Sequence, residues 1–185
     1  MPPPSSRTDH ELMEAVQGGD AAALEVLFAR HHHRLFSYLS RLTRDDHAAE
    51  DLTQETFLRL LRYPERYERS GAFLAWLYRV SRNLAIDRHR RERDEPLAES
   101  ESAIADDRPL LLDRMVMEEQ HQALDDVLAS LSMPHREILL LRGVEGLDHR
   151  DIGIALSCTE GTARVRLHRA TAALRQAWFA RHGEH

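Results

Sequence analysis

Apolar residues recur at helical spacing along almost the whole chain. The clearest example is the stretch 159–174, whose apolar positions follow one another at intervals of four, three and four residues: Ala163, Leu167, Ala170 and Leu174. Such spacing places side chains on one face of an α-helix. The strict alternation typical of strands is missing, and glycine and proline stand at the ends of the periodic stretches. The pattern predicts an all-α fold.

The breaks in this pattern divide the chain into helices and one connecting segment. Helices are expected at residues 9–17, 21–42, 46–63, 72–91, 115–131 and 132–142, followed by a helix pair within 147–174 that is broken at Ser157 and Cys158. The apolar side of the second helix includes Phe28 and His31. Residues 94–113 are polar and acidic and contain two prolines, a composition that suits a flexible linker. We therefore expect two small helical domains, 9–93 and 114–182, joined by an acidic linker at 94–113.

The helix pair has the features of a DNA-binding helix-turn-helix. Five arginines and one acid lie between Thr159 and Arg181, so the second helix buries one face and exposes arginine elsewhere. That arrangement fits phosphate and base contacts in a major groove, and the free amides at the helix start favour a phosphate. A plain helical hairpin is the alternative. The candidate contact residues are Arg150, Thr159, Glu160, Gly161, Thr162, Arg164, Val165, Arg166 and Arg169.

A second basic surface is expected on the helix at 72–91. Its polar residues avoid the apolar stripe, and aromatic residues precede it from Tyr63 onward. Unpaired bases stack on aromatic rings while the backbone meets arginine, which indicates single-stranded DNA binding. The alternative is that Phe73 and Trp76 simply fill the core. The candidate residues are Arg79, Arg82, Asn83, Asp87, Arg88, Arg90 and Arg91.

A compact polar patch is expected in the middle of the helix at 46–63. Asp51, Gln54, Glu55 and Leu58 follow one another at spacings of three, one and three residues, so they share one side of the helix. Such a surface suits a basic helical partner. An ordinary solvated helix face is the alternative.

The net charge of −6 hides an uneven distribution. Residues 79–93 hold six arginines against two acids, and residues 159–181 hold five against one, so each block carries +4. Residues 94–119 hold nine acids against two arginines, or −7. A DNA phosphate responds to the local charge, so the two basic blocks are compatible with nucleic-acid binding despite the acidic total.

The sequence offers little for metal, cofactor or catalytic chemistry. Three consecutive histidines, His31 to His33, point about 100° apart on a helix and do not chelate one ion from one face. Cys158 is the single cysteine, so we expect no internal disulfide and a reducing, cytoplasmic location. No secretory or membrane-spanning segment is expected. We predict a protein that is not an enzyme and needs no cofactor or metal.

In this order, the three motifs resemble the sigma-70 family of bacterial RNA polymerase initiation factors, within the compact extracytoplasmic-function group. The resemblance covers residues 11–175 and rests on DLTQETF at 51–57, FLAWLYRVSRNLAIDRHRR at 73–91 and the block at 131–170. It implies that the first motif docks on the polymerase clamp helices, that the second melts and reads the −10 promoter element, and that the third reads the −35 element. Core RNA polymerase (clamp helices and flap), promoter DNA and an anti-sigma protein are then the partners to expect.

The helix-turn-helix departs from the family pattern at His149, Gly153, Ser157, Ala163 and Val165, and two of these departures affect the backbone. Ser157 replaces the usual glycine of the turn, which costs up to about 1 kcal/mol if the backbone there is left-handed. Gly153 replaces the usual alanine and weakens its helix by a similar order. Two other functions stay open: a sigma mimic that titrates an anti-sigma protein without binding promoters, and a free-standing repressor. In the free chain, we expect the two domains to fold together and hide their DNA-binding faces.

Overall fold

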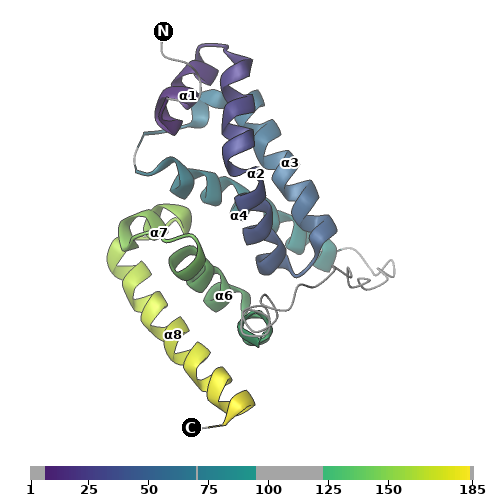
Figure 1. Cartoon of the computed structure of the whole chain (residues 1–185), viewed down its shortest axis with the longest axis vertical. Coiled ribbons are helices and arrows are strands. Elements are labelled where there is room, and N and C mark those ends of the chain that lie inside the picture. The colour runs from purple at the N-terminus through teal and green to yellow at the C-terminus, as the bar shows by residue number, and fades with distance from the viewer. Residues whose placement is uncertain (1–6, 70, 95–122, 184–185) are drawn as a thin grey trace, which may run out of the picture.

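The computed structural model of the chain describes residues 7–69, 71–94 and 123–183. Every regular element in these ranges is helical, so the all-α prediction is confirmed. An N-terminal and a C-terminal group of helices meet along α4 (Phe73–Asp94) and α7 (His149–Ala155) (Figure 1). Almost all of the expected linker at 94–113 lies outside the described residues. None of the described helices is both long and apolar enough for a bilayer crossing.

The helices of the N-terminal group begin at side chains that cap them. Thr8 and Glu11 form a reciprocal capping box, and Asp20 and Asp45 each accept a hydrogen bond from an amide in the first turn that follows. These side chains satisfy amide groups that have no partner within the helix. The elements that precede α4 are α1 (Asp9–Gln17), α2 (Ala21–Thr43), α3 (Asp46–Arg62) and the 3-10 turn η2 (Pro64–Arg66).

The core of this group lies between α2, α3 and α4. Phe73 and Trp76 are 3% and 4% exposed, so both rings belong to the core, as the alternative interpretation of the aromatic segment had it. His31 is also buried, with its Nε2 atom 2.9 Å from a carboxylate oxygen of Asp9. Phe28 differs from the expectation: it is 41% exposed. Its ring meets the edge of Phe57 at the rim of the core rather than entering it.

The C-terminal group contains the predicted helix pair. Residues 123–130 are helical, and the start of the helix expected at 115–131 lies outside the described residues. The helix expected at 132–142 is divided into α6 (Met133–Leu139) and a π-helical turn, η3 (Leu140–Val144). The second helix of the pair, α8 (Glu160–His182), continues beyond the expected end of the pair at residue 174. Its basic residues in the last turn suit a helix C-terminus.

The structure explains the glycine at position 153 but not the serine at position 157. Asp148 and Thr159 cap the two helices. Ser157 has a φ of 53°, so this turn does use the left-handed conformation that favours glycine. Gly153 is needed where it stands, because a Cβ atom there would lie 2.8 Å from the backbone oxygen of Cys158. The turn that leads into α8 therefore approaches α7 more closely than an alanine at position 153 would allow.

Candidate nucleic-acid interfaces and docking surface

The start of α8 presents an exposed basic face. Ala163 and Ala170 are fully buried, while Val165 is 51% exposed on the opposite side, as the spacing predicts. The other predicted contact residues on α8 and its cap are exposed, and so is Arg150 on α7. Arg164 donates to Glu160, one turn earlier on the helix, at 3.0 Å. Arg166 and Arg169 are exposed on the outer face. The expectation that both DNA-binding faces are hidden in the free chain is therefore wrong for α8.

The cap of α8 prepares its start for an anionic ligand. The Thr159 hydroxyl accepts from the amide of Thr162 at 3.2 Å, so the helix begins abruptly in solvent. The amide dipoles of the first turn add to the charge of the arginines, and both attract phosphate. A two-turn exposed surface with arginine and one apolar side chain is of the kind that reads base edges in a major groove.

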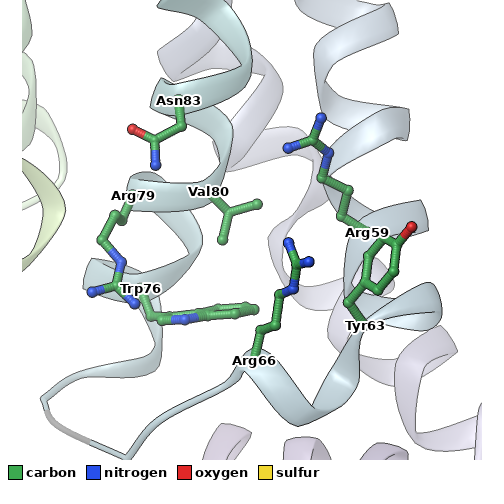
Figure 2. Close-up of a pocket in the computed structure, with 7 residues that line it drawn as sticks. All are labelled: Arg59, Tyr63, Arg66, Trp76, Arg79, Val80 and Asn83. Atoms are coloured by element: carbon green, nitrogen blue, oxygen red, sulfur yellow. The ribbon is translucent and has the colours of Figure 1, made fainter. Parts of the chain in front are cut away.

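A pocket lies between the end of α3, η2 and the first half of α4 (Figure 2). Its volume is about 190 Å³. Three arginines line it, and the guanidinium group of Arg66 lies between the Trp76 ring on one side and the Tyr63 ring on the other (Figure 2). The residues that line it are Arg59, Tyr63, Arg66, Trp76, Arg79, Val80 and Asn83.

The pocket combines aromatic walls with hydrogen-bond donors. The Arg66 guanidinium lies 4.5 Å from the centre of the Tyr63 ring, a cation–π contact that holds both at the rim. Arg59 is anchored by Glu55 one turn earlier, at 3.2 Å. Rings for stacking and arginines for phosphates are the two parts that a single-stranded nucleic-acid site requires.

Sequence reasoning missed Arg59 and Arg66 as members of this site. Both precede α4 in the chain: Arg59 lies on α3, which packs against α4, and Arg66 lies in the turn η2. A signal for Arg66 existed in the mixed aromatic and basic segment YPERYER at 63–69, most of which the helical pattern leaves outside any helix. This segment connects α3 to α4, and its residues Tyr63 and Arg66 line the pocket beside α4.

The structure divides the residues predicted for the basic helix among different surroundings. Arg79 and Asn83 line the pocket. Arg82 instead turns toward the C-terminal group and forms an ion pair with Glu137 at 2.6 Å. Arg88 pairs with Asp51 at 3.1 Å. The remaining three, Asp87, Arg90 and Arg91, are exposed along the second half of α4.

The predicted docking patch on α3 is accessible and contains more apolar surface than the sequence indicated. Asp51 and Gln54 are exposed, Glu55 is half-buried, and Leu58 is 41% exposed. Leu61, one turn further along α3, is also exposed. Exposed Phe28 contacts Phe57, which precedes Leu61 by one turn, so apolar surface continues from α3 to α2.

Comparison with known proteins identifies the family. The Sigma-70 region 2 family model matches residues 27–95, and the Sigma-70 region 4 model matches residues 121–174. The chain is 37% identical over 171 residues to the RNA polymerase sigma factor CarQ of Myxococcus xanthus, covering 89% of this chain and 94% of the relative. It is 34% identical over 164 residues to the ECF RNA polymerase sigma factor SigL of Mycobacterium tuberculosis, covering 84% and 89%.

The fold agrees with these matches. The sigma factor RpoE, solved in complex with the anti-sigma factor NepR from Bartonella quintana, superposes with a TM-score of 0.64 at 24% identity, covering 83% of this chain and 94% of that chain. The chain belongs to the sigma-70 family, in its extracytoplasmic-function (ECF) group, and its function is that of an RNA polymerase sigma factor, which directs the core enzyme to specific promoters and initiates transcription. Proteins of this family are not enzymes.

Proposed function

We propose that this sigma factor divides promoter recognition between its two helical groups. Residues 9–93 form the domain that docks on core polymerase and captures the −10 element, and residues 114–182 form the domain that reads the −35 element. The segment 94–113 connects them. The observation that carries this proposal is the pairing of two different nucleic-acid surfaces: an exposed arginine helix suited to a duplex and an aromatic, arginine-lined pocket suited to a single strand.

The −35 role belongs to α8. A helix reads a duplex by entering the major groove, where arginine recognises guanine through two hydrogen bonds and an apolar side chain contacts the thymine methyl group. Arg166 and Val165 are exposed neighbours on the outward face and have these two chemistries. Arg150, on the preceding helix, and the amides of Glu160 and Gly161 in the first turn of α8 then hold the phosphates on either side.

The −10 role belongs to the pocket of Figure 2 together with the exposed part of α4. A base that leaves the duplex loses its stacking, which costs a few kcal/mol. Stacking against the exposed Tyr63 ring restores part of that energy, while Arg66 and Arg79 neutralise the adjoining phosphates. The chain thereby stabilises an opened strand by binding it, and the chemistry of RNA synthesis is left to the polymerase. We propose no catalytic activity for the chain itself.

The polymerase contact belongs to the patch on α3. Asp51, Gln54 and Glu55 offer acceptors to a basic helix, and Leu58 and Leu61 offer apolar area beside them. Phe28, on α2, extends the same surface. We place the protein in the cytoplasm with core polymerase, and an anti-sigma protein is a further partner, because the structurally similar RpoE was solved with one.

Transcription with purified components tests this proposal. The protein and core polymerase are mixed with a promoter library, and transcripts are sequenced with and without the protein. The expected result is a set of starts that depend on the protein and share two upstream elements. Starts that do not change on adding the protein would contradict it, and binding of an anti-sigma protein without any dependent starts would instead support the sigma mimic.

A further inference from the structure

Helix α1 packs against the turn that carries two residues of the pocket. The 3-10 turn η2 supplies Arg66 to the pocket and follows directly after Tyr63, whereas α1 supplies none of the lining residues. α1 contacts both η2 and α2, and its apolar side, Leu12, Met13 and Val16, is buried in the core. The buried side fixes α1 in place, so its polar side chains can hold the turn from outside the pocket.

Gln17, the last residue of α1, binds this turn through its side-chain amide. Its Nε2 atom donates to the backbone oxygen of Pro64 at 3.0 Å and to that of Tyr67 at 3.3 Å. Pro64 begins η2 and Tyr67 follows its last residue, and the amide of Tyr67 also donates to Pro64, at 3.1 Å. One exposed side chain thereby ties together both ends of a turn that begins 47 residues further along the chain.

His10, near the start of α1, contacts the same segment. Its Nδ1 atom meets the hydroxyl of Tyr67, whose pKa is raised to about 12 by burial, so the hydroxyl stays protonated at neutral pH and can donate. The Tyr67 ring is 6% exposed and meets the Trp76 ring edge-on, with 5.0 Å between the centres. Because Trp76 is a wall of the pocket, α1 is connected to the pocket through Tyr67 as well as through the backbone of the turn.

The turn has little structure of its own to fix it. Pro64 has no amide hydrogen, and hydrogen-bond geometry is poor in a 3-10 turn. Tyr63 and Arg66 are exposed, and they contact each other in the cation–π pair rather than entering the core. The ion pair between Glu14 and Arg69 is exposed at both ends, so it adds little. The orientation of the Tyr63 ring and the Arg66 guanidinium therefore depends on how α1 holds the backbone of the turn.

We propose that Gln17 is a positioning residue for capture of the −10 strand: by holding both ends of η2, it keeps Tyr63 and Arg66 at the pocket before DNA arrives. This inference rests on the proposed function of the pocket. Side chains that are already ordered lose less freedom when a ligand binds, and ordering one long side chain during binding weakens affinity by about 2- to 10-fold. Gln17 does not line the pocket, so it acts through the turn and not by contacting the strand.

Replacing Gln17 with methionine tests the proposal. Methionine has a similar length and helix propensity but donates no hydrogen bond, and Gln17 is exposed, so the substitution leaves the core intact. Gln176→Met, at an exposed position on α8, is the matched control. With the complete chain bound to core polymerase, Gln17→Met should bind a fork whose −10 element is already single-stranded about 2- to 10-fold more weakly than the control does. Binding of a duplex with the upstream element alone should not change. Equal binding of the fork by both variants would overturn the proposal.

A double substitution separates positioning from a general loss of structure. In a chain that already carries Tyr63→Ala and Arg66→Ala, Gln17→Met should weaken fork binding by less than about twofold, because the side chains that it orients are gone. A similar loss in both backgrounds would contradict the positioning role. If Tyr63→Ala with Arg66→Ala leaves fork binding unchanged, the proposed function of the pocket fails. If that pair weakens fork binding and Gln17→Met does not, only the positioning role fails.

Discussion

Replacing Tyr63 with alanine tests whether the pocket of Figure 2 captures an unpaired base. The ring is 43% exposed, so its removal leaves no large cavity in the core and should change the free energy of unfolding little. The loss of the cation–π contact with Arg66, at 4.5 Å, adds about 0.5–1 kcal/mol to that change. Stacking of one base on an aromatic ring contributes about 1–3 kcal/mol. Binding of an opened promoter should therefore weaken by about 5- to 150-fold.

The assay compares two DNA ligands for the holoenzyme. One is a fork in which the −10 element is already single-stranded, and the other is a closed duplex that carries the upstream element only. Tyr63→Ala should weaken binding to the fork and leave binding to the duplex unchanged, and Tyr63→Phe should bind both like the native protein because it keeps the ring. An equal loss on both ligands, or no loss on the fork, would refute the role of this ring.

Three further predictions concern the helix-turn-helix and the core. Arg166→Ala should weaken binding of duplex DNA with the upstream element by about 1–3 kcal/mol, measured by titration, and unchanged affinity would remove Arg166 from the base-reading set. Ser157→Gly should raise the free energy of unfolding by about 0.5–1 kcal/mol in urea denaturation, because the φ of 53° favours glycine, and a destabilised variant would contradict this. Burial raises the pKa of Asp9, but hydrogen bonds from His31 and Arg30 outweigh it and leave that pKa below its ordinary value of 3.8. Its contribution to stability is thus present above the unfolded pKa and lost as the pH falls through the folded pKa, and Asp9→Asn should lose that part of the acid dependence in unfolding measured from neutral to acid pH.

Much of the fold follows from local sequence signals. Helix starts at Thr8, Asp20, Asp45, Asp148 and Thr159 are determined by side chains that bond to amides only two or three residues away. The buried stripe of α8 follows from its spacing alone. Such features need no knowledge of the rest of the chain, which is why periodicity and capping residues predict them.

What the sequence did not predict depends on contacts between distant segments. Phe28 fits the apolar side of α2 by spacing, yet the core ends at Phe57 and leaves it exposed. Arg82 belongs by spacing to the exposed basic side of α4, yet a carboxylate more than fifty residues away in the chain covers it. The cap that Asp151 provides for α4 comes from another helical group. Neither periodicity nor composition carries that information.

The candidate sites also combine features that one helix determines with features that need several segments of the chain. The exposed arginines of α8 are predictable because one helix contains both the buried stripe and the basic face. The pocket beside α4 is built from α3, η2 and α4 together, so only its α4 members, Arg79 and Asn83, were identified from the sequence as polar contacts. The docking patch on α3 was predicted from Asp51, Gln54, Glu55 and Leu58, while its apolar extension to Phe28 on α2 depends on the packing of α2 against α3.

Site-specific photo-cross-linking in the complete initiation complex tests the division of promoter recognition most directly. One probe replaces Val165 on the outward face of α8, and the other replaces Tyr63 at the rim of the pocket. We predict that the first probe reacts only with duplex DNA at the upstream element and the second only with the opened strand at the downstream element. Reaction of both probes with the same element, or transcription without any reaction of the Tyr63 probe with DNA, would contradict the account.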